Sequence, residues 1–414
     1  MPAALKGLIG NAVIGQSGGP TAVINQSLVG AIGALRGFRN VRRILGMRHG
    51  VNGLVKSDIV DLGRLKSPPL ERIAQSPAAA LGSSRDKPDP EYCARILEAC
   101  KRHDIRYFFY IGGNDSSDTC RIVSELAEKD GKHELRCFHI PKTVDNDLML
   151  SDHTPGYPSA ARYIALAFMA DALDNASLPG VKINVVMGRN AGFLTAAAAL
   201  ARCEGGEGGG KIFPDRAAHL IYLPEVPFDS QRFLADVERV YSRLGRCQIA
   251  VSEGITDAQK RPIATTLVKG LDTDAHGNVQ LSGVGALGDA LAELVKNNIK
   301  KDAKPVRVRA DTLGYLQRCW PDPSPVDSRE ARGAARFAVG LARTGEHSGS
   351  VAITRKPGRA YRTEFQHIQL TDVAGKTRYM PPEFIEGTCD VSDAFVRYAL
   401  PLVGKLPKLV RIED

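Results

Sequence analysis

Short apolar runs alternate with longer segments of helical periodicity along most of this chain. Tyr107–Ile111 is almost continuously apolar, as expected for a strand covered on both faces, and Asn11–Gly15, Leu135–Ile140 and Val181–Val186 have the same character. Further strands are expected at 41–45, 248–251, 306–310 and 350–354, and helices at 21–35, 91–103, 158–175 and 328–343, with others ending at Glu128 and Arg202. Strands that alternate with helices predict parallel sheets covered by helices, which is an α/β fold.

The length of 414 residues exceeds what one ordinary core organises and suits two α/β domains. Hydrophobic residues make up 43% and charged residues 24% of the chain, which are the values of a globular protein. The longest apolar runs are far too short to span a membrane, and the N-terminal residues lack the hydrophobic core of a signal peptide. The eight cysteines include no C-x-x-C pair, and no histidine joins them at metal-ligand spacing. We therefore expect a cytoplasmic protein with reduced thiols and no membrane partner.

The formal net charge of +9 favours anionic partners. Lysine and arginine are dispersed over the whole chain, aromatic residues make up only 6%, and the sequence has no nucleic-acid recognition motif. A basic balance is also expected when the substrates are small phosphorylated molecules. We therefore expect anionic small molecules, and no nucleic acid, as partners.

The octet Pro141–Leu148 directly follows a predicted strand, at the edge of an α/β sheet where ligands bind. Asp145 and Asp147 place two carboxylates two residues apart, and Lys142 precedes them. Phosphoryl transfer needs a carboxylate that takes a hydroxyl proton, a second that holds a metal or orients a neighbour, and a cation that neutralises the group in transfer. The octet alone leaves a solvated polar turn equally open, because Asp and Asn are common turn residues.

The stretch Gln16–Pro20 joins a predicted strand to a predicted helix through Gly18 and Gly19. Such a corner binds phosphate because free backbone N–H groups and the helix dipole face the ligand, and glycine lets an anion approach the backbone closely. An ordinary tight turn between a strand and a helix is the alternative.

Two other glycine-rich stretches fail the test of their structural context. Gly205–Lys211 has the spacing G-x-x-x-x-G-K, but Ile212 replaces the Ser or Thr that would hold magnesium, and the stretch follows a helix rather than a strand. Gly283–Gly288 matches G-x-G-x-x-G, but it follows a turn rather than a long strand. We interpret the first as a surface loop and the second as a helix start, which disfavours a dinucleotide-dependent oxidoreductase.

Seven motifs of the chain occur in the order of one enzyme family. They are Gln16–Pro20, Leu81–Arg85, Gly112–Ser116, Pro141–Asp147, Met187–Arg189, Ser252–Gly254 and Leu313–Arg318. In this order they resemble the phosphofructokinase family, specifically its pyrophosphate-dependent branch, from about residue 11 to at least residue 320. The resemblance implies two Rossmann-like α/β domains with parallel sheets and the active site in the cleft between them. Residues 1–155 and 318–356 would form the phosphoryl-donor domain, and residues 156–317 and 357–414 the sugar-phosphate domain.

The resemblance also implies a reaction and a set of site residues. The reaction is the reversible, magnesium-dependent transfer of a phosphoryl group from pyrophosphate to the 1-hydroxyl of fructose 6-phosphate, by a homodimer or homotetramer; the products are fructose 1,6-bisphosphate and phosphate. The implied catalytic residues are Asp145 as base, Lys142 to steady the transferred group, and Asp147, Thr143 and Arg189. The residues implied to bind pyrophosphate are Gly18, Gly19, Arg85, Gly113, Asp115 and Ser116. Those implied to bind the sugar phosphate are Met187, Gly188, Arg189, Glu253, Arg309, Tyr315 and Arg318.

On the sugar side, the chain departs from the family pattern at two positions. Relatives that bind sugar phosphates often carry Arg where this chain has Gly180, and although Lys182 is nearby, this substrate contact is left open. Tyr315 stands where many ATP-using members have His, and its hydroxyl can still donate to a phosphate. Arg309 and Arg318 match the arginines that bind the distal phosphate of the sugar, often from a neighbouring subunit.

On the donor side, Asp115 and Lys142 stand where ATP-using members typically carry Gly. An Asp side chain fills the space of the nucleotide's α-phosphate and adds negative charge there, whereas Lys142 reaches the shorter donor. Most members have Asp where this chain has Asn114, which is a weaker ligand for a hard cation. We therefore expect magnesium at Asp115, with help from Asp145 or Asp147, and direct ligation by Asn114 stays open.

Three other functions remain as alternatives to this reading. The first is an ATP-dependent phosphofructokinase on the same scaffold. The second is the same chemistry with sedoheptulose 7-phosphate as the acceptor. The third is a non-catalytic sugar-phosphate-binding subunit, which is disfavoured because the catalytic set is intact.

Overall fold

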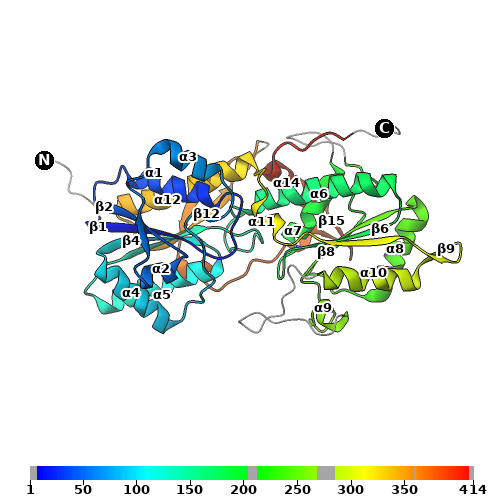
Figure 1. Ribbon diagram of the computed structural model, residues 1–414, viewed down its shortest axis with the longest axis horizontal. Helices are drawn as coiled ribbons and strands as arrows, with labels where there is room; N and C mark the ends of the chain where they lie inside the picture. Colours follow the sequence, from blue (N-terminus) through cyan, green and yellow to red (C-terminus); the bar gives the residue numbers. More distant parts are fainter. Residues whose placement is uncertain (1–6, 204–211, 268–284, 359, 410–414) are drawn as a thin grey trace. The chain divides into compact units, whose positions relative to one another are not determined.

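The computed structural model describes residues 7–203, 212–267, 285–358 and 360–409. Gly205–Lys211 and the first two residues of Gly283–Gly288 lie outside the described residues, so the surface loop expected at Gly205–Lys211 stays a prediction. The chain divides into two compact units (Figure 1). Unit 1 contains Met1–Ser159 and Arg318–Arg378, and unit 2 contains Ala160–Gln317 and Tyr379–Asp414.

Unit 1 is built on a seven-stranded sheet with the order β13-β12-β5-β4-β1-β2-β3. Its central strands are parallel, and β3 and β13 at the two edges run antiparallel to their neighbours. The strands are β1 (Gly10–Gln16), β2 (Val41–Met47), β3 (Ile59–Asp61), β4 (Ile105–Gly112), β5 (Arg136–Pro141), β12 (Gly349–Arg355) and β13 (Thr363–Ile368). The helices are α1 (Ile24–Leu35), α2 (Val51–Val55), α3 (Ser67–Gln75), α4 (Pro90–Arg102), α5 (Asn114–Asp130), α12 (Pro325–Thr344) and α13 (Leu370–Val373).

Alternate residues of β4 point to opposite faces of this sheet. Phe109 and Ile111 belong to a core that includes residues of α1 and α12, whereas Phe108 and Tyr110 belong to a second core with residues of α4 and α5. Figure 1 shows α1 and α12 on one face of the sheet and α4 and α5 on the other. Because both faces are covered, the strand is apolar throughout, as the sequence predicts.

Unit 2 is built on a four-stranded parallel sheet with the order β11-β6-β8-β7. The strands are β6 (Val181–Val186), β7 (Leu220–Tyr222), β8 (Cys247–Ser252) and β11 (Val308–Thr312). The helices are α6 (Tyr157–Ser177), α7 (Phe193–Ala196), α8 (Ser230–Leu244), α9 (Ile263–Leu267), α10 (Ala286–Asn298), α11 (Leu316–Cys319), α14 (Asp393–Val403) and the short 3-10 helices η1 (Ala197–Arg202) and η2 (Pro382–Phe384). Two small antiparallel pairs join β9 (Lys300–Lys301) to β10 (Lys304–Pro305) and β14 (Ile385–Glu386) to β15 (Asp390–Val391).

The α/β fold class and its parallel sheets are confirmed, and α10 begins at Ala286 within the stretch interpreted as a helix start. The structure differs from the expected helix ending at Arg202. There α7 gives way to the 3-10 helix η1, whose six residues are all buried. Packing on every side, rather than the helix propensity of alanine, therefore sets the geometry of this segment.

The boundary of unit 1 also differs from the expected one at residue 356. Residues 357–378 were expected in the second domain, but β13 pairs antiparallel with β12 and completes the sheet of unit 1. No residue of β13 is fully buried, as is usual for an edge strand, so its apolar signal in the sequence is weak. Among the described residues, no helix has both the length and the apolarity needed to cross a bilayer.

Candidate active site

The carboxyl ends of three neighbouring parallel strands bring the predicted donor residues together at one edge of the unit 1 sheet. In the register of the sheet, Gln16 of β1 lies opposite Ile111 of β4, and Gly112 of β4 lies opposite Pro141 of β5. The turns that follow these strands are therefore adjacent. They carry Gly18 and Gly19, the start of α5 with Gly113, Asp115 and Ser116, and the octet with both carboxylates.

Lys142 lies against the glycine turn. Its Nζ donates to the Gly19 carbonyl at 2.8 Å, and a Cβ placed on Gly18 would come within 3.0 Å of the same nitrogen. Gly18 also has a φ of 74°, so a residue with a side chain at this position would strain the backbone and crowd the ammonium group. Burial lowers the pKa of Lys142 to about 8, and the Arg318 charge acts in the same direction. The amine is thus mainly charged at pH 7.

Two arginines add positive charge to the same turn. The Arg318 guanidinium lies so close to Gly19 that a Cβ there would be 3.0 Å from its central carbon. Arg85 follows a loop that is bonded to the turn, because the Gly18 N–H donates to the Ser84 carbonyl at 2.8 Å. Arg318 was predicted to bind the distal phosphate of the sugar, and within unit 1 it lies beside the predicted donor residues.

The octet folds as a tight turn around Asn146. Asn146 is fully buried with a left-handed φ of 60°, and its Oδ1 accepts a hydrogen bond from the Thr154 N–H at 2.9 Å. Thr143 closes the turn, since its hydroxyl accepts from the Asp145 N–H at 3.1 Å. Burial raises the pKa of Asp147, and the charge of neighbouring Asp145 raises it further. Two carboxylates that repel each other in this way form a place where a cation is stabilised.

The residues around Asp147 offer oxygen ligands of the kind that magnesium prefers. Asn114 donates its amide nitrogen to Asp147 Oδ2 at 3.2 Å, and its own Oδ1 is buried without a hydrogen-bond partner. Asp115, the predicted ligand, is exposed in the first turn of α5. Within the described part of the chain, no group of three or more His, Cys, Asp or Glu residues could hold a metal ion. The carboxylate of Asp147 and the amide oxygen of Asn114 are nevertheless oxygen ligands that fit a hard cation.

His139 supports this edge of the sheet, although the sequence did not single it out. It is fully buried in β5, where Nε2 lies 2.8 Å from the Gly112 carbonyl and Nδ1 lies 2.7 Å from Ser350 Oγ. Burial lowers the pKa of His139 to about 4, so the ring is neutral and donates to only one partner. The Lys142 N–H donates to the same carbonyl at 2.9 Å. In the sequence, His139 could be recognised only as a polar residue within an apolar strand.

In unit 2, the turns after β6 and β8 bring the predicted sugar residues together. Val186 lies opposite Ser252 in the sheet, and the Glu253 N–H donates to the Val186 carbonyl at 2.9 Å. The Ser252 hydroxyl donates to the Gly188 carbonyl at 2.7 Å. A Cβ on Gly254 would lie 1.9 Å from the Arg189 carbonyl oxygen, so the two turns are in direct contact.

Met187 is held by a residue that the sequence reading passed over. Its N–H donates to the side-chain oxygen of Gln317 at 3.1 Å, and only 1% of Gln317 is exposed. Gln317 lies within the predicted motif Leu313–Arg318 and directly precedes Arg318. The sequence therefore placed Gln317 in a motif but indicated no role for it.

Lys182 does not take the place of the arginine that relatives often carry at the position of Gly180. Its ammonium pairs with Asp171 at 2.9 Å, Asp174 at 3.4 Å and Asp311 at 3.8 Å, and its side chain is 15% exposed. The charge is thus already neutralised within unit 2. The predicted residues Arg309 and Tyr315 are exposed on and just after β11.

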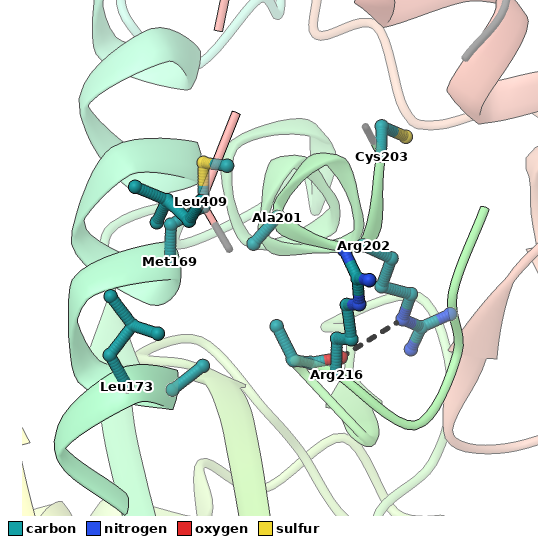
Figure 2. Close-up of a pocket in the computed structure, with 9 residues that line it drawn as sticks. Met169, Leu173, Ala201, Arg202, Cys203, Arg216 and Leu409 are labelled. Atoms are coloured by element: carbon teal, nitrogen blue, oxygen red, sulfur yellow. Dashed lines mark hydrogen bonds between the residues drawn. The ribbon is translucent and has the colours of Figure 1, made fainter. Parts of the chain in front are cut away.

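A small cavity in unit 2 has no part in this site (Figure 2). Its volume of about 30 Å³ suits a single water molecule rather than a sugar phosphate. None of the predicted site residues lines it. Arg202, on the wall of the cavity, donates from Nε to the Ala217 carbonyl at 3.3 Å and pairs with Asp390 at 2.9 Å. Its charge is therefore neutralised within unit 2.

Comparisons with known proteins show the family to which this chain belongs. A family model described as Phosphofructokinase matches residues 11–342. A pyrophosphate–fructose 6-phosphate 1-phosphotransferase of Rhodospirillum rubrum is 53% identical over 408 residues, which is 98% of this chain and 97% of the relative. A protein of the same name from Xanthomonas campestris is 37% identical, over 96% of this chain and 93% of its own.

A solved structure shares the fold over nearly the whole chain. It is a pyrophosphate-dependent phosphofructokinase from Marinobacter aquaeolei, 31% identical, with a TM-score of 0.81 over 96% of this chain and 92% of its own. The match of the family model, the two relatives and this structure all lead to the same conclusion. The chain belongs to the phosphofructokinase family.

Proposed function

We propose that this protein transfers a phosphoryl group reversibly from pyrophosphate to the 1-hydroxyl of fructose 6-phosphate, with magnesium. The relatives from Rhodospirillum rubrum and Xanthomonas campestris bear the name of this activity, and the first matches nearly the whole chain. The observation that carries the proposal is the position of Lys142, a buried cation bonded to the glycine turn at Gly19. A short, highly charged donor needs such a cation at the group in transfer.

On the donor side, each group of unit 1 has a task in this reaction. The backbone at Gly18 and Gly19 leaves room for a phosphate, and Lys142 and Arg318 neutralise its charge. Asp145 takes the proton of the sugar's 1-hydroxyl as the oxygen attacks the phosphorus. Magnesium, when bound, shields the oxygens of pyrophosphate from one another, and the oxygens of Asp147 and Asn114 are suited to hold it.

On the sugar side, the turns after β6 and β8 supply the contacts. Glu253 is 5% exposed at the end of β8 and accepts hydrogen bonds from sugar hydroxyls. Met187 and Gly188 border the sugar, and Arg189 contacts the phosphoryl group or the substrate phosphate. Arg309, Tyr315 and Arg318 bind the distal phosphate, as the family resemblance implies.

Unit 1 is accordingly the donor unit and unit 2 the sugar unit. We also propose that the enzyme is cytoplasmic and acts as a homodimer or homotetramer, which the family resemblance implies. An ATP-dependent enzyme on the same scaffold is disfavoured because Lys142 and Asp115 both stand where the ATP-using pattern has glycine.

A panel of donors and acceptors tests this function. Purified protein is assayed with pyrophosphate or ATP, each with fructose 6-phosphate or sedoheptulose 7-phosphate, at saturating magnesium. Pyrophosphate with fructose 6-phosphate should give the highest kcat/KM, and Asp145→Asn should lower kcat by about 10²- to 10⁴-fold while the fold is kept. A preference for ATP would overturn the donor, and near-normal turnover of the variant would remove Asp145 from the role of base.

A further inference from the structure

A short segment that follows the catalytic turn holds it in place. In this supporting segment (residues 153–156), the Thr154 N–H donates to Asn146 Oδ1 at 2.9 Å. In return, the Thr143 N–H donates to the Pro155 carbonyl at 3.1 Å. The catalytic turn is thus bonded to the supporting segment both through a side chain and through the backbone.

Asn146 needs this support because of its backbone conformation. Its φ of 60° is left-handed, and a residue with a side chain keeps this conformation only where the surroundings fix it. Asn146 lies between Asp145 and Asp147, so a rotation at this residue would turn both carboxylates. The bond from Thr154 is therefore one point at which the surroundings control the catalytic groups.

The supporting segment is itself anchored by an ionic triad. His153 is fully buried, with Nδ1 at 2.8 Å from Asp152 Oδ2 and Nε2 at 2.6 Å from Glu330 Oε2. A ring that faces a carboxylate at each nitrogen holds both protons and is an imidazolium. Burial by itself lowers the pKa of His153, but the bonds to Asp152 and Glu330 outweigh it and raise the pKa to about 9.

Glu330 connects the triad to α12, and its carboxylate is fully engaged. It also accepts from the Tyr361 hydroxyl at 2.8 Å and the Thr363 hydroxyl at 2.9 Å, and only 4% of the residue is exposed. One turn earlier in α12, Asp327 accepts from the Gly156 N–H at 2.9 Å. The helix therefore holds both ends of the supporting segment.

A buried ionic network is weak evidence for stability, because its desolvation cost cancels much of its attraction. Here it ends one peptide bond from Thr154, and we propose that His153 and Glu330 are positioning residues for phosphoryl transfer. They keep the Thr154 N–H where it fixes Asn146, and thereby set the directions of Asp145 and Asp147. This inference rests on the proposed function.

The main test compares Glu330→Gln with Glu71→Gln. The first change keeps the shape of the side chain but removes the charge that faces His153. The second makes the same chemical change at an exposed carboxylate of α3, which pairs with Arg332 of α12 at 2.8 Å and has no link to the turn. Glu330→Gln should lower kcat at least about tenfold, with KM for both substrates within about twofold, whereas Glu71→Gln should stay within about twofold in both constants. A kcat within twofold of the unmodified enzyme for Glu330→Gln would overturn the inference.

A double-mutant cycle tests whether Glu330 acts through Asn146. Asn146→Gly keeps the left-handed backbone accessible and removes the acceptor for Thr154. If the supporting segment acts through this acceptor, adding Glu330→Gln should lower kcat by less than about threefold beyond the single Asn146→Gly variant. Losses that multiply in the double variant would overturn the inference, since they would show two independent effects.

Hydrogen–deuterium exchange gives a readout that does not depend on activity. Peptides covering residues 143–156 should exchange faster in Glu330→Gln than in the Glu71→Gln control, while β1 and β4 keep their protection. Unchanged exchange in these peptides would overturn the inference even if the enzyme catalysed another reaction. Failure of the unmodified enzyme in the substrate panel would overturn only the proposed function.

If Glu330→Gln does not fold, Tyr361→Phe is the second variant, because it removes one donor to the same carboxylate. Tyr361→Phe should lower kcat at least about threefold, and an unchanged kcat would overturn the inference.

Discussion

At the scale of single residues, Lys142 is a buried cation beside the glycine turn where we propose that the phosphate donor binds. Its surroundings contain the like charge of Arg318, so burial and repulsion together make its proton easier to lose. The same burial strengthens its attraction for a phosphate, since charges interact more strongly where water is excluded. The residue therefore combines strong binding with a charge that depends on pH.

The first prediction concerns this pH dependence. Because the pKa of Lys142 is lowered to about 8, the amine is charged below that value and neutral above it. The kcat/KM for pyrophosphate should fall as pH rises through about 8. Lys142→Arg serves as the matched control, because a guanidinium does not titrate in this range, and its profile should lack this alkaline limb. An identical limb in both proteins would assign it to another group.

The second prediction concerns the choice of donor. Asp115→Gly should raise kcat/KM for ATP at least about tenfold, because it removes bulk and negative charge that only the longer donor meets. Lys142→Gly should mainly abolish the use of pyrophosphate. Both variants are assayed at saturating magnesium, since Asp115 is also the predicted metal ligand. If Asp115→Gly leaves ATP use unchanged, exclusion at this position is the wrong explanation.

At the scale of elements, the sequence predicted the features that depend on the local pattern of apolar, polar and turn residues. Most strands of the two sheets are apolar runs between turns, and the glycine turn and the octet follow two of them, so these strands and the donor residues could be predicted together. The short strands β3 and β7 were not predicted. The strand β13 and the 3-10 helix η1 were missed because pairing and packing shape them, not their own residues. His139 and Glu330 were missed for a related reason. Their partners are distant in sequence, and a single buried polar residue gives no periodic signal.

The third prediction follows from the triad of Asp152, His153 and Glu330, which joins α12 to the supporting segment. The folded pKa of His153 is raised to about 9, above its usual value near 6.5. Its contribution to stability is therefore fully present below about pH 6.5 and is lost as pH rises through about 9. The difference in urea midpoint between the unmodified protein and His153→Gln should shrink over this range. His139→Gln is the control of opposite sign, because the pKa of His139 is lowered to about 4 and its contribution is lost as pH falls below about 6.5. A His153 difference that does not change with pH would contradict the imidazolium.

At the scale of the whole molecule, the two arginines predicted to bind the distal phosphate belong to different units. Arg309 is in β11 of unit 2, whereas Arg318 is counted with unit 1 and lies against Gly19. The boundary falls within α11, between Gln317, which holds Met187, and Arg318. One short helix therefore carries a sugar-side support and a donor-side cation in adjacent positions.

The fourth prediction separates these two arginines. Arg309→Ala should raise KM for fructose 6-phosphate at least about tenfold and leave KM for pyrophosphate within about twofold. Arg318→Ala should raise both constants, because its guanidinium lies beside the donor turn. An effect of Arg318→Ala on the sugar phosphate alone would assign this residue to the distal phosphate only.

The two units alternate along the sequence, and this has a consequence for how the protein is made. The strand β12 pairs with β5 and α12 packs on the same core as α1, yet both elements are encoded after the larger part of unit 2, Ala160–Gln317. At about 5–20 residues per second, a ribosome needs roughly 10–30 s to translate the residues between the two parts of unit 1. During this time the edge of β5 is open, and an open edge invites pairing with another chain. The nascent chain that has released Ala160–Gln317 but not yet β12 is thus the form most exposed to aggregation, and the yield of folded protein should depend on chaperones and on elongation speed.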